Sequence, residues 1–386
     1  MNLPRSTATA WLAWVIFVVY GSLLPFDFHA LALDAAMARF QQLPFLKVGV
    51  ESRADWVANG VLYLPVGALA ARWLATALGP HCRWLAVVIA SVGGVLLATA
   101  VEFAQLYFPP RTVSQNDLIA ESLGSLLGAM GAPMLQPWAA GVREAWRRGG
   151  PRFLLRSLEV YVLGYVGLSL FPYDLLLSAQ EWHGKLSSDN CGVLLARSSL
   201  ERGWLVVPLL AIESMLAVPF GLLLALWRRP RITSIGVACL SGAALGLLIE
   251  GGQLATASGI AQGLSIATRA AGVALGAWLV TQPGHGVPWL RHRLHRHAGP
   301  VTAAYLLLLL AANGWFNHPF RDLAAAQTQW VQLRLMPFYY HYYTTEAAAV
   351  FSLGSVALMY LPVALSGWAR WRPVGADLLT DRKSVV

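Results

Sequence analysis

Long apolar segments, separated by shorter polar segments, run through the whole chain. Segments of about 17–25 mostly apolar residues are long enough to cross the hydrocarbon core of a bilayer as helices. The pattern therefore predicts an all-α fold, a polytopic bundle of about ten transmembrane helices. The predicted spans are residues 8–24, 55–75, 84–107, 116–136, 155–171, 203–226, 232–256, 263–281, 300–316 and 347–369.

Similar short segments recur along the chain at a nearly fixed spacing. Ser-Leu-Leu-Pro-Phe-Asp-Phe at residues 22–28 is followed 147 residues later by Ser-Leu-Phe-Pro-Tyr-Asp-Leu. Similarity at a fixed spacing is the signature of an internal repeat, so the sequence predicts a bundle built from repeats of about 148 residues. Further pairs, 148 residues apart, are Glu102 and Gln105 with Glu250 and Gln253, and Gly124 and Gly128 with Gly272 and Gly276.

A third, incomplete repeat is expected from a weaker similarity. Tyr-Leu-Pro-Val at residues 63–66 recurs at residues 360–363. The predicted organisation is a four-helix membrane repeat, a degenerate second repeat and part of a third. The last six residues resemble a translated sequencing adapter, and we expect them to be non-native. The corresponding boundaries are residues 1–148, 149–298, 299–380 and 381–386.

Composition and charge agree with a membrane location. The chain is 57% hydrophobic and 12% charged, with a mean hydropathy of +0.55, whereas soluble domains are about 25% charged. Sixteen Lys and Arg residues fall in mostly short loops on one side of the predicted spans. The positive-inside rule then places both termini in the cytoplasm. These basic residues account for the net charge of +9 near anionic lipid, so nucleic acid is not expected as a partner.

Polar residues of the first repeat gather around the end of its third span. Glu102 and Gln105 lie three residues apart and share a helix face, Arg111 follows in a loop, and Asp117 opens the next span. A carboxylate in the bilayer is costly and needs a partner. We therefore expect these residues to line an outward-facing polar pocket, together with two polar residues of the second span. The candidate ligand-binding residues are Asp55, Asn59, Glu102, Gln105, Arg111 and Asp117.

Glycines continue the helix stripe that Asp117 begins. Gly124 and Gly128 follow Asp117 by seven and eleven residues, which are nearly whole numbers of helical turns. Small residues let neighbouring membrane helices approach closely. We predict helix packing for these glycines and for their counterparts Gly272 and Gly276.

The spacing of these residues resembles that of the VanZ-like family, most clearly over residues 10–136. The shared pattern is Glu-x-x-Gln, Pro-Arg, an aspartate six residues after the arginine, and the two later glycines. Two positions depart from it: Glu121 replaces the usual asparagine, and Trp56 replaces a basic residue. The resemblance implies a multi-pass protein of the bacterial cytoplasmic (inner) membrane, linked to glycopeptide-antibiotic tolerance. It implies no established reaction.

The second repeat keeps fewer of these polar residues. Gly259 stands where the first repeat has Arg111, and Ser265 stands where it has Asp117. Glu250 is therefore expected to be a lone carboxylate, and its replacement to have a mild effect.

Several functions remain open at this point. The polar residues of the first repeat form either a ligand pocket or a structural network of ion pairs and helix caps. We expect a non-enzymatic protein that binds a lipid or glycolipid head group, with membrane lipids and a lipid-linked glycan or envelope precursor as partners. The alternatives are a transporter of a lipid-linked or glycan substrate and a membrane enzyme acting on a phosphate-containing lipid. No catalytic residue, metal site or cofactor is predicted.

Overall fold

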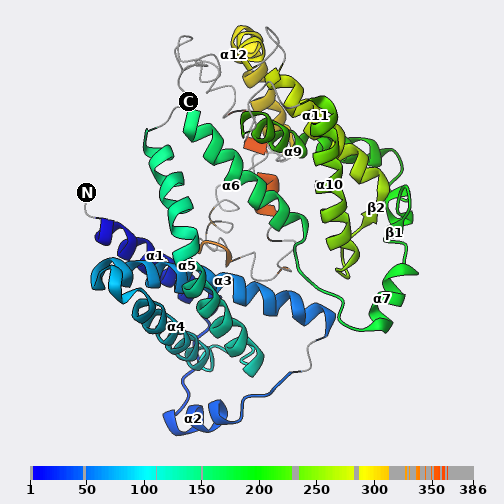
Figure 1. The fold of residues 1–386 in the computed structure, drawn as a ribbon. Coiled ribbons are helices and arrows are strands. Elements are labelled where there is room, and N and C mark those ends of the chain that lie inside the picture. The colour runs from blue at the N-terminus through cyan, green and yellow to red at the C-terminus, as the bar shows by residue number, and fades with distance from the viewer. Residues whose placement is uncertain are drawn as a thin grey trace. The chain divides into compact units, whose positions relative to one another are not determined.

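The computed structural model describes residues 3–312, apart from residues 47–48, 110, 149–150, 228–233 and 282–286, and scattered residues from 327 to 363. Almost all regular structure in this part of the chain is α-helical (Figure 1). Two short strands, β1 (Cys191–Gly192) and β2 (Ala261–Gln262), pair in parallel. The all-α fold class is confirmed.

The chain divides into two compact units. The first unit comprises residues 1–144 and 172–181, and the second comprises residues 145–171 and 182–386. Helices of the first unit are α1 (Leu3–Leu23), α2 (Leu33–Gln41), α3 (Val50–Leu78), the 3-10 helix η1 (Pro80–Cys82), α4 (Arg83–Gln105) and α5 (Gln115–Arg148), whose last residues belong to the second unit.

Helices of the second unit follow the same order of long apolar segments. They are α6 (Pro151–Ser169), α7 (Ala179–Leu186), which begins in the first unit, α8 (Arg197–Leu200), the 3-10 helix η2 (Gly203–Leu205), α9 (Val206–Trp227), α10 (Ile235–Leu254), α11 (Gly263–Thr281) and α12 (Val287–Ala312). The predicted repeat boundaries remain a prediction. The tenth predicted span and the tail at 381–386 lie largely or wholly outside the described residues.

Seven of the described helices are long and apolar enough to cross a membrane. They correspond to seven of the ten spans predicted from the sequence. The predicted fifth span is α6, a helix of 19 residues whose first turns carry Arg152 and Arg156. The predicted ninth span is represented by the shorter apolar segment Ala298–Ala311. The protein is therefore a multi-pass membrane protein.

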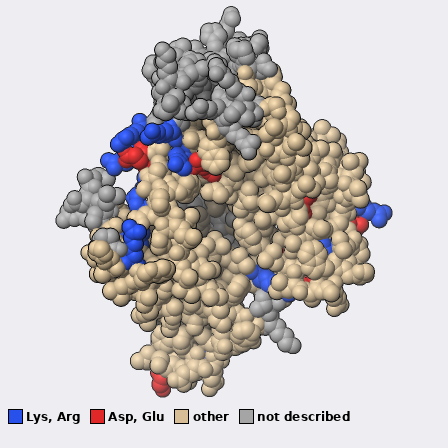
Figure 2. Space-filling view, in the orientation of Figure 1, with Lys and Arg blue, Asp and Glu red and all other residues tan. Residues whose placement is uncertain are grey.

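Small residues fill the helix contacts, and large apolar residues face outward. In the first unit one buried cluster includes Ala70, Ala90 and Ala129. Trp84 and Leu96 are exposed by 77% and 64%. Charged side chains are sparse on the face drawn in Figure 2. This distribution suits a lipid environment, in which close backbone packing replaces burial of large apolar side chains as the source of helix association.

Glycines on α5 bring it against α3. A Cβ atom at Gly124 would collide with the carbonyl oxygen of Gly60, and one at Gly128 with that of Leu64. Glycine is therefore required for this approach. In the second unit, Gly272 and Gly276 of α11 stand in the same way against the carbonyl oxygens of Ser214 and Val218 on α9.

Candidate functional site

Polar side chains of the first unit meet where α4 ends and α5 begins. Asp117 lies in the first turn of α5 and accepts hydrogen bonds from the Asn59 side-chain amide (2.8 Å) and the Ser114 hydroxyl (2.6 Å). The Ser114 oxygen in turn accepts the backbone N–H of Asp117 at 3.2 Å, which caps the helix. The structure therefore joins two predicted site residues, Asn59 and Asp117. It also places Asp117 beside Ser114, which caps the start of α5.

Gln105 and Arg111 direct their side chains toward the end of α1. The Gln105 amide donates to the Ser22 carbonyl at 3.1 Å. Arg111 donates from Nε to the same carbonyl (2.7 Å) and from a terminal nitrogen to that of Gly21 (2.8 Å). The last carbonyls of a helix lack partners within the helix, and a cation there also interacts favourably with the helix dipole. These contacts support α1 structurally.

Asp55 lies one turn before Asn59 on α3 and is exposed. Its participation in the cluster stays a prediction. Sequence reasoning also missed Gln115 and Asn116, which hold the loop between α2 and α3. The Gln115 amide donates to the Leu43 carbonyl (2.7 Å), and the Asn116 side chain exchanges hydrogen bonds with the Leu46 backbone at 2.8 and 3.1 Å.

Buried carboxylates form the centre of the first unit's cluster. Glu102 on α4 and Glu121 on α5 are each 2% exposed, and Tyr63 on α3 is fully buried. These residues influence one another electrostatically. Asp117 and Arg111, which carry opposite charges, act on both glutamates in opposite directions. Glu102 also accepts a hydrogen bond from the Ser114 backbone N–H. We name Glu102, Glu121 and Tyr63 the acidic cluster.

The Tyr63 hydroxyl hydrogen-bonds with the Glu121 side chain. Glu102 and Glu121 each keep one buried oxygen, Oε2, without a hydrogen-bond partner. Buried polar atoms are nearly always paired, so each such atom calls for an explanation. The sequence held a signal for two of these residues, because Glu121 lies four residues after Asp117 and Tyr63 four residues after Asn59.

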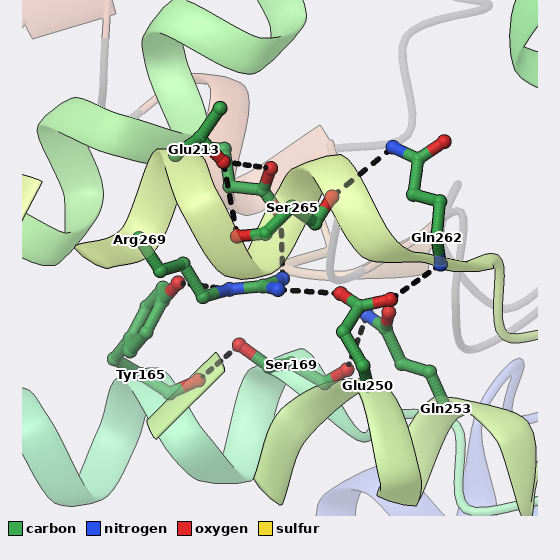
Figure 3. Close-up of polar contacts among 9 residues, drawn as sticks. Tyr165, Ser169, Glu213, Glu250, Gln253, Gln262, Ser265 and Arg269 are labelled. Atoms are coloured by element: carbon green, nitrogen blue, oxygen red, sulfur yellow. Dashed lines mark hydrogen bonds and ion pairs between the residues drawn. The ribbon is translucent and has the colours of Figure 1, made fainter. Parts of the chain in front are cut away.

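The second unit contains a buried ion cluster that sequence reasoning did not predict. Arg269 on α11 contacts Glu250 of α10 and Glu213 of α9, with N–O distances of 2.5 Å in both pairs (Figure 3). Arg269 is 4% exposed. The expectation that Glu250 is a lone carboxylate is therefore wrong, because Arg269 is its cationic partner. The sequence did not indicate this pair, since the first repeat has no basic residue at the position that corresponds to Arg269.

Neighbouring side chains complete this ion cluster. Arg269 Nε donates to the Tyr165 hydroxyl at 3.0 Å, so every guanidinium nitrogen has an acceptor. The Gln262 backbone N–H donates to Glu250 Oε2 at 2.6 Å, and the Thr268 hydroxyl donates to Glu213 at 2.8 Å (Figure 3). The charges of this ion cluster are thus paired within the second unit.

One contact recurs in both units. The Gln253 amide donates to the Ser169 carbonyl at 3.2 Å, as the Gln105 amide does to Ser22. Together with the matched glycine contacts, this similarity supports the predicted repeat, which remains a prediction.

Each unit also has a pocket. A pocket of about 210 Å³ in the second unit is lined partly by Glu213, Gln253, Gln262 and Ser265. A groove of about 300 Å³ in the first unit lies along α4 and α5 and is mainly apolar; its lining residues are Ser91, Val92, Val95, Leu96, Ser122, Leu123 and Leu126. Within the described residues, no group of three or more His, Cys, Asp or Glu side chains could hold a metal ion.

Comparison with known proteins gives one family. Residues 7–136 match the family model described as VanZ/LLP1. This segment contains most of α1, the helices α2 to α4, most of α5 and the whole acidic cluster. Neither the curated proteins nor the solved structures gave a match.

Proposed function

Because residues 7–136 make this chain a VanZ-like integral membrane protein, we propose that it binds the head group of an envelope lipid or glycolipid at the acidic cluster. The proposed setting is the outer face of the bacterial cytoplasmic membrane. The proposed consequence is a contribution to glycopeptide-antibiotic tolerance.

The unpaired oxygens of the acidic cluster carry this proposal. Glu102 and Glu121 are buried at the meeting point of membrane-spanning helices, and each keeps an oxygen without a partner. Burying a carboxylate without complete pairing costs several kcal/mol by most estimates. A bound head group with hydrogen-bond donors would offset this cost. The second unit needs no donor from a ligand, because the Arg269 side chain pairs with its carboxylates.

The apolar groove along α4 and α5 supports a lipid rather than a free solute as the ligand. Leu96 and Leu123 line this groove and are exposed by 64% and 41%. Hydrocarbon chains fit such a surface at no cost in polar desolvation. Ser122, which lines the groove, follows Glu121 directly in the sequence, so α5 contributes residues to both the groove and the acidic cluster.

Lipid retention by the purified protein tests the proposal. Wild-type protein extracted in mild detergent should retain lipid detectable by native mass spectrometry. The double variant Glu102→Gln with Glu121→Gln should lose that lipid at a normal melting temperature and normal expression. Glu181→Gln, which changes a carboxylate outside the spans, is the matched control and should retain it. Equal lipid retention by the acidic-cluster variant would refute the proposal.

A transporter is the second candidate, favoured by the buried charges of the second unit. Duplicated transporters keep polar groups within the spans of both halves, and both units here have a buried charged cluster. Flux of labelled lipid across proteoliposomes would distinguish transport from binding. An enzyme gains less support, because two guanidinium nitrogens of Arg111 donate to carbonyl oxygens of α1, which makes them less accessible to a phosphate.

A further inference from the structure

The clusters of the two units carry opposite charges at one matched position. Glu121 of α5 corresponds to Arg269 of α11, 148 residues later, and Glu102 corresponds to Glu250 at the same spacing. In the second unit the cation at this position contacts Glu250 at 2.5 Å. In the first unit a second carboxylate replaces the cation.

This exchange places a second buried carboxyl group in the first unit where the second unit has a cation. In their ionised forms Glu102, Glu121 and Asp117 would repel one another, and Arg111 would oppose that repulsion. Like charges in a poorly solvated site disfavour each other strongly. Asp117 is stabilised by Asn59 and Ser114, whereas Glu102 and Glu121 each keep an unpaired oxygen.

We propose that the acidic cluster binds a primary ammonium group between Glu102 and Glu121, in the place that the Arg269 guanidinium takes in the second unit. This inference rests on the proposed head-group function and names the chemistry of the head group. An ammonium group has three N–H donors. Glu102 and Glu121 each offer a carboxylate oxygen, Oε2, that has no partner. The donors and the charge of an ammonium group therefore suit this pair of carboxylates.

The source of the amine is either a lipid or glycolipid head group or a free amine. A neutral sugar would satisfy the hydrogen bonds but leave the charge of Glu102 and Glu121 uncompensated. A tetraalkylammonium ion carries the charge but has no N–H donor. These two differences provide the controls for a test.

The first experiment measures the melting temperature of the full-length protein in detergent with ethylammonium chloride. Sodium chloride and tetraethylammonium chloride at equal ionic strength are the controls. Near-saturating ethylammonium should raise the melting temperature by about 2–4 °C, while the two control salts should not. The same response to all three salts would overturn the inference.

Variants then locate the effect. Glu121→Arg gives the first unit the charge arrangement of the second, so the response to ethylammonium should disappear. The double variant Glu102→Gln with Glu121→Gln should also be unresponsive, and it serves if Glu121→Arg does not fold. Glu213→Gln, in the second unit, should keep the response. A normal response in either acidic-cluster variant would overturn the inference.

Lipid binding separates this inference from the proposed function. The protein is mixed with vesicles of phosphatidylglycerol containing either phosphatidylethanolamine or phosphatidylcholine, and the retained lipid is identified. Preference for the primary amine, abolished by Glu102→Gln with Glu121→Gln, supports both ideas. Retention that depends on the acidic cluster but shows no amine preference overturns only this inference. An ethylammonium response without lipid retention supports the ammonium site and overturns the head-group function.

Discussion

At the scale of single residues, charge pairing distinguishes the two units. Arg269 joins carboxylates from two other helices, and its nitrogens contact Glu213, Glu250 and Tyr165. Among the described residues, Arg111 acts electrostatically on Glu102 and Glu121, and its printed hydrogen bonds go to the Gly21 and Ser22 carbonyls. At one matched position the second unit thus has the cation Arg269 where the first unit has the carboxyl group of Glu121.

Arg269→Ala should therefore destabilise the protein strongly. It leaves the partly buried Glu213 and the buried Glu250 without a cation, and breaking a buried ion pair costs about 3–5 kcal/mol. The measurement is the melting temperature in detergent, together with the amount of protein in the membrane. Arg202→Ala, at an exposed position of the same unit, is the control and should resemble the wild type. A normal melting temperature for Arg269→Ala would contradict the structural role of the ion cluster.

Glu181 provides a pH-dependent contact outside the spans. Arg53 donates to both carboxylate oxygens at 2.9 Å, and the Leu177 and Ser178 backbone amides donate as well. Hydrogen bonding by Arg53, followed by these amides, lowers the pKa of Glu181 from 4.5 to about 2. The carboxylate stays ionised in the folded protein at pH values where it would be protonated in the unfolded chain.

The contribution of Glu181 to stability should therefore be complete above its ordinary pKa and fall as the pH decreases from about 4.5 toward 2. Melting temperatures of the wild type and Glu181→Gln, measured between these values and at pH 6, check this expectation. The two proteins should differ most at pH 6 and converge in acid. A difference that stays constant with pH would show that the carboxylate charge is unimportant.

At the scale of helices, glycine positions set the distance between α3 and α5. Gly124→Ala should destabilise by about 1–3 kcal/mol, because its Cβ meets the Gly60 carbonyl and the helices must separate. Gly131→Ala, on the same helix, is a matched control, since nothing lies within 4 Å of its added Cβ. Thermal melting of both variants measures the difference. Equal stability would indicate that α5 is not held at this distance.

At the scale of the whole molecule, orientation in the membrane is the main prediction. The distribution of Lys and Arg places Arg148 in the cytoplasm and the segment around Val193 outside. Val193 is 99% exposed and Arg148 is also exposed, so both positions suit cysteine labelling after the three native cysteines are removed. A membrane-impermeant reagent should label Val193→Cys in intact cells and Arg148→Cys only after permeabilisation. The reverse result would invert the topology.

The sequence by itself determined the positions of seven membrane helices. Apolar segment length decides whether a helix can cross a bilayer, and that property is local. Helix ends were less well determined: α5 continues to Arg148, through Pro133 and Pro137, although the apolar pattern predicted an end at residue 136. Proline does not end a membrane helix when neighbouring groups satisfy the freed carbonyl.

The sequence also located the polar residues of the first unit, because their spacing is local. It did not show how they are used. Gln105 and Arg111 lie in the predicted region, but their contacts with Ser22 and Gly21 join segments more than 80 residues apart. Such contacts depend on how helices pack, and spacing along one helix carries no information about the facing helix.

Only the tertiary structure decided which charges are paired. Glu213, Glu250 and Arg269 lie on α9, α10 and α11, and none of the three predicts the others from local spacing. Likewise, Glu121 looked like a departure from a family pattern until packing placed it with Glu102 and Tyr63. The physical reason is that the cost of a buried charge depends on the groups that surround it in space, and helix packing chooses those groups.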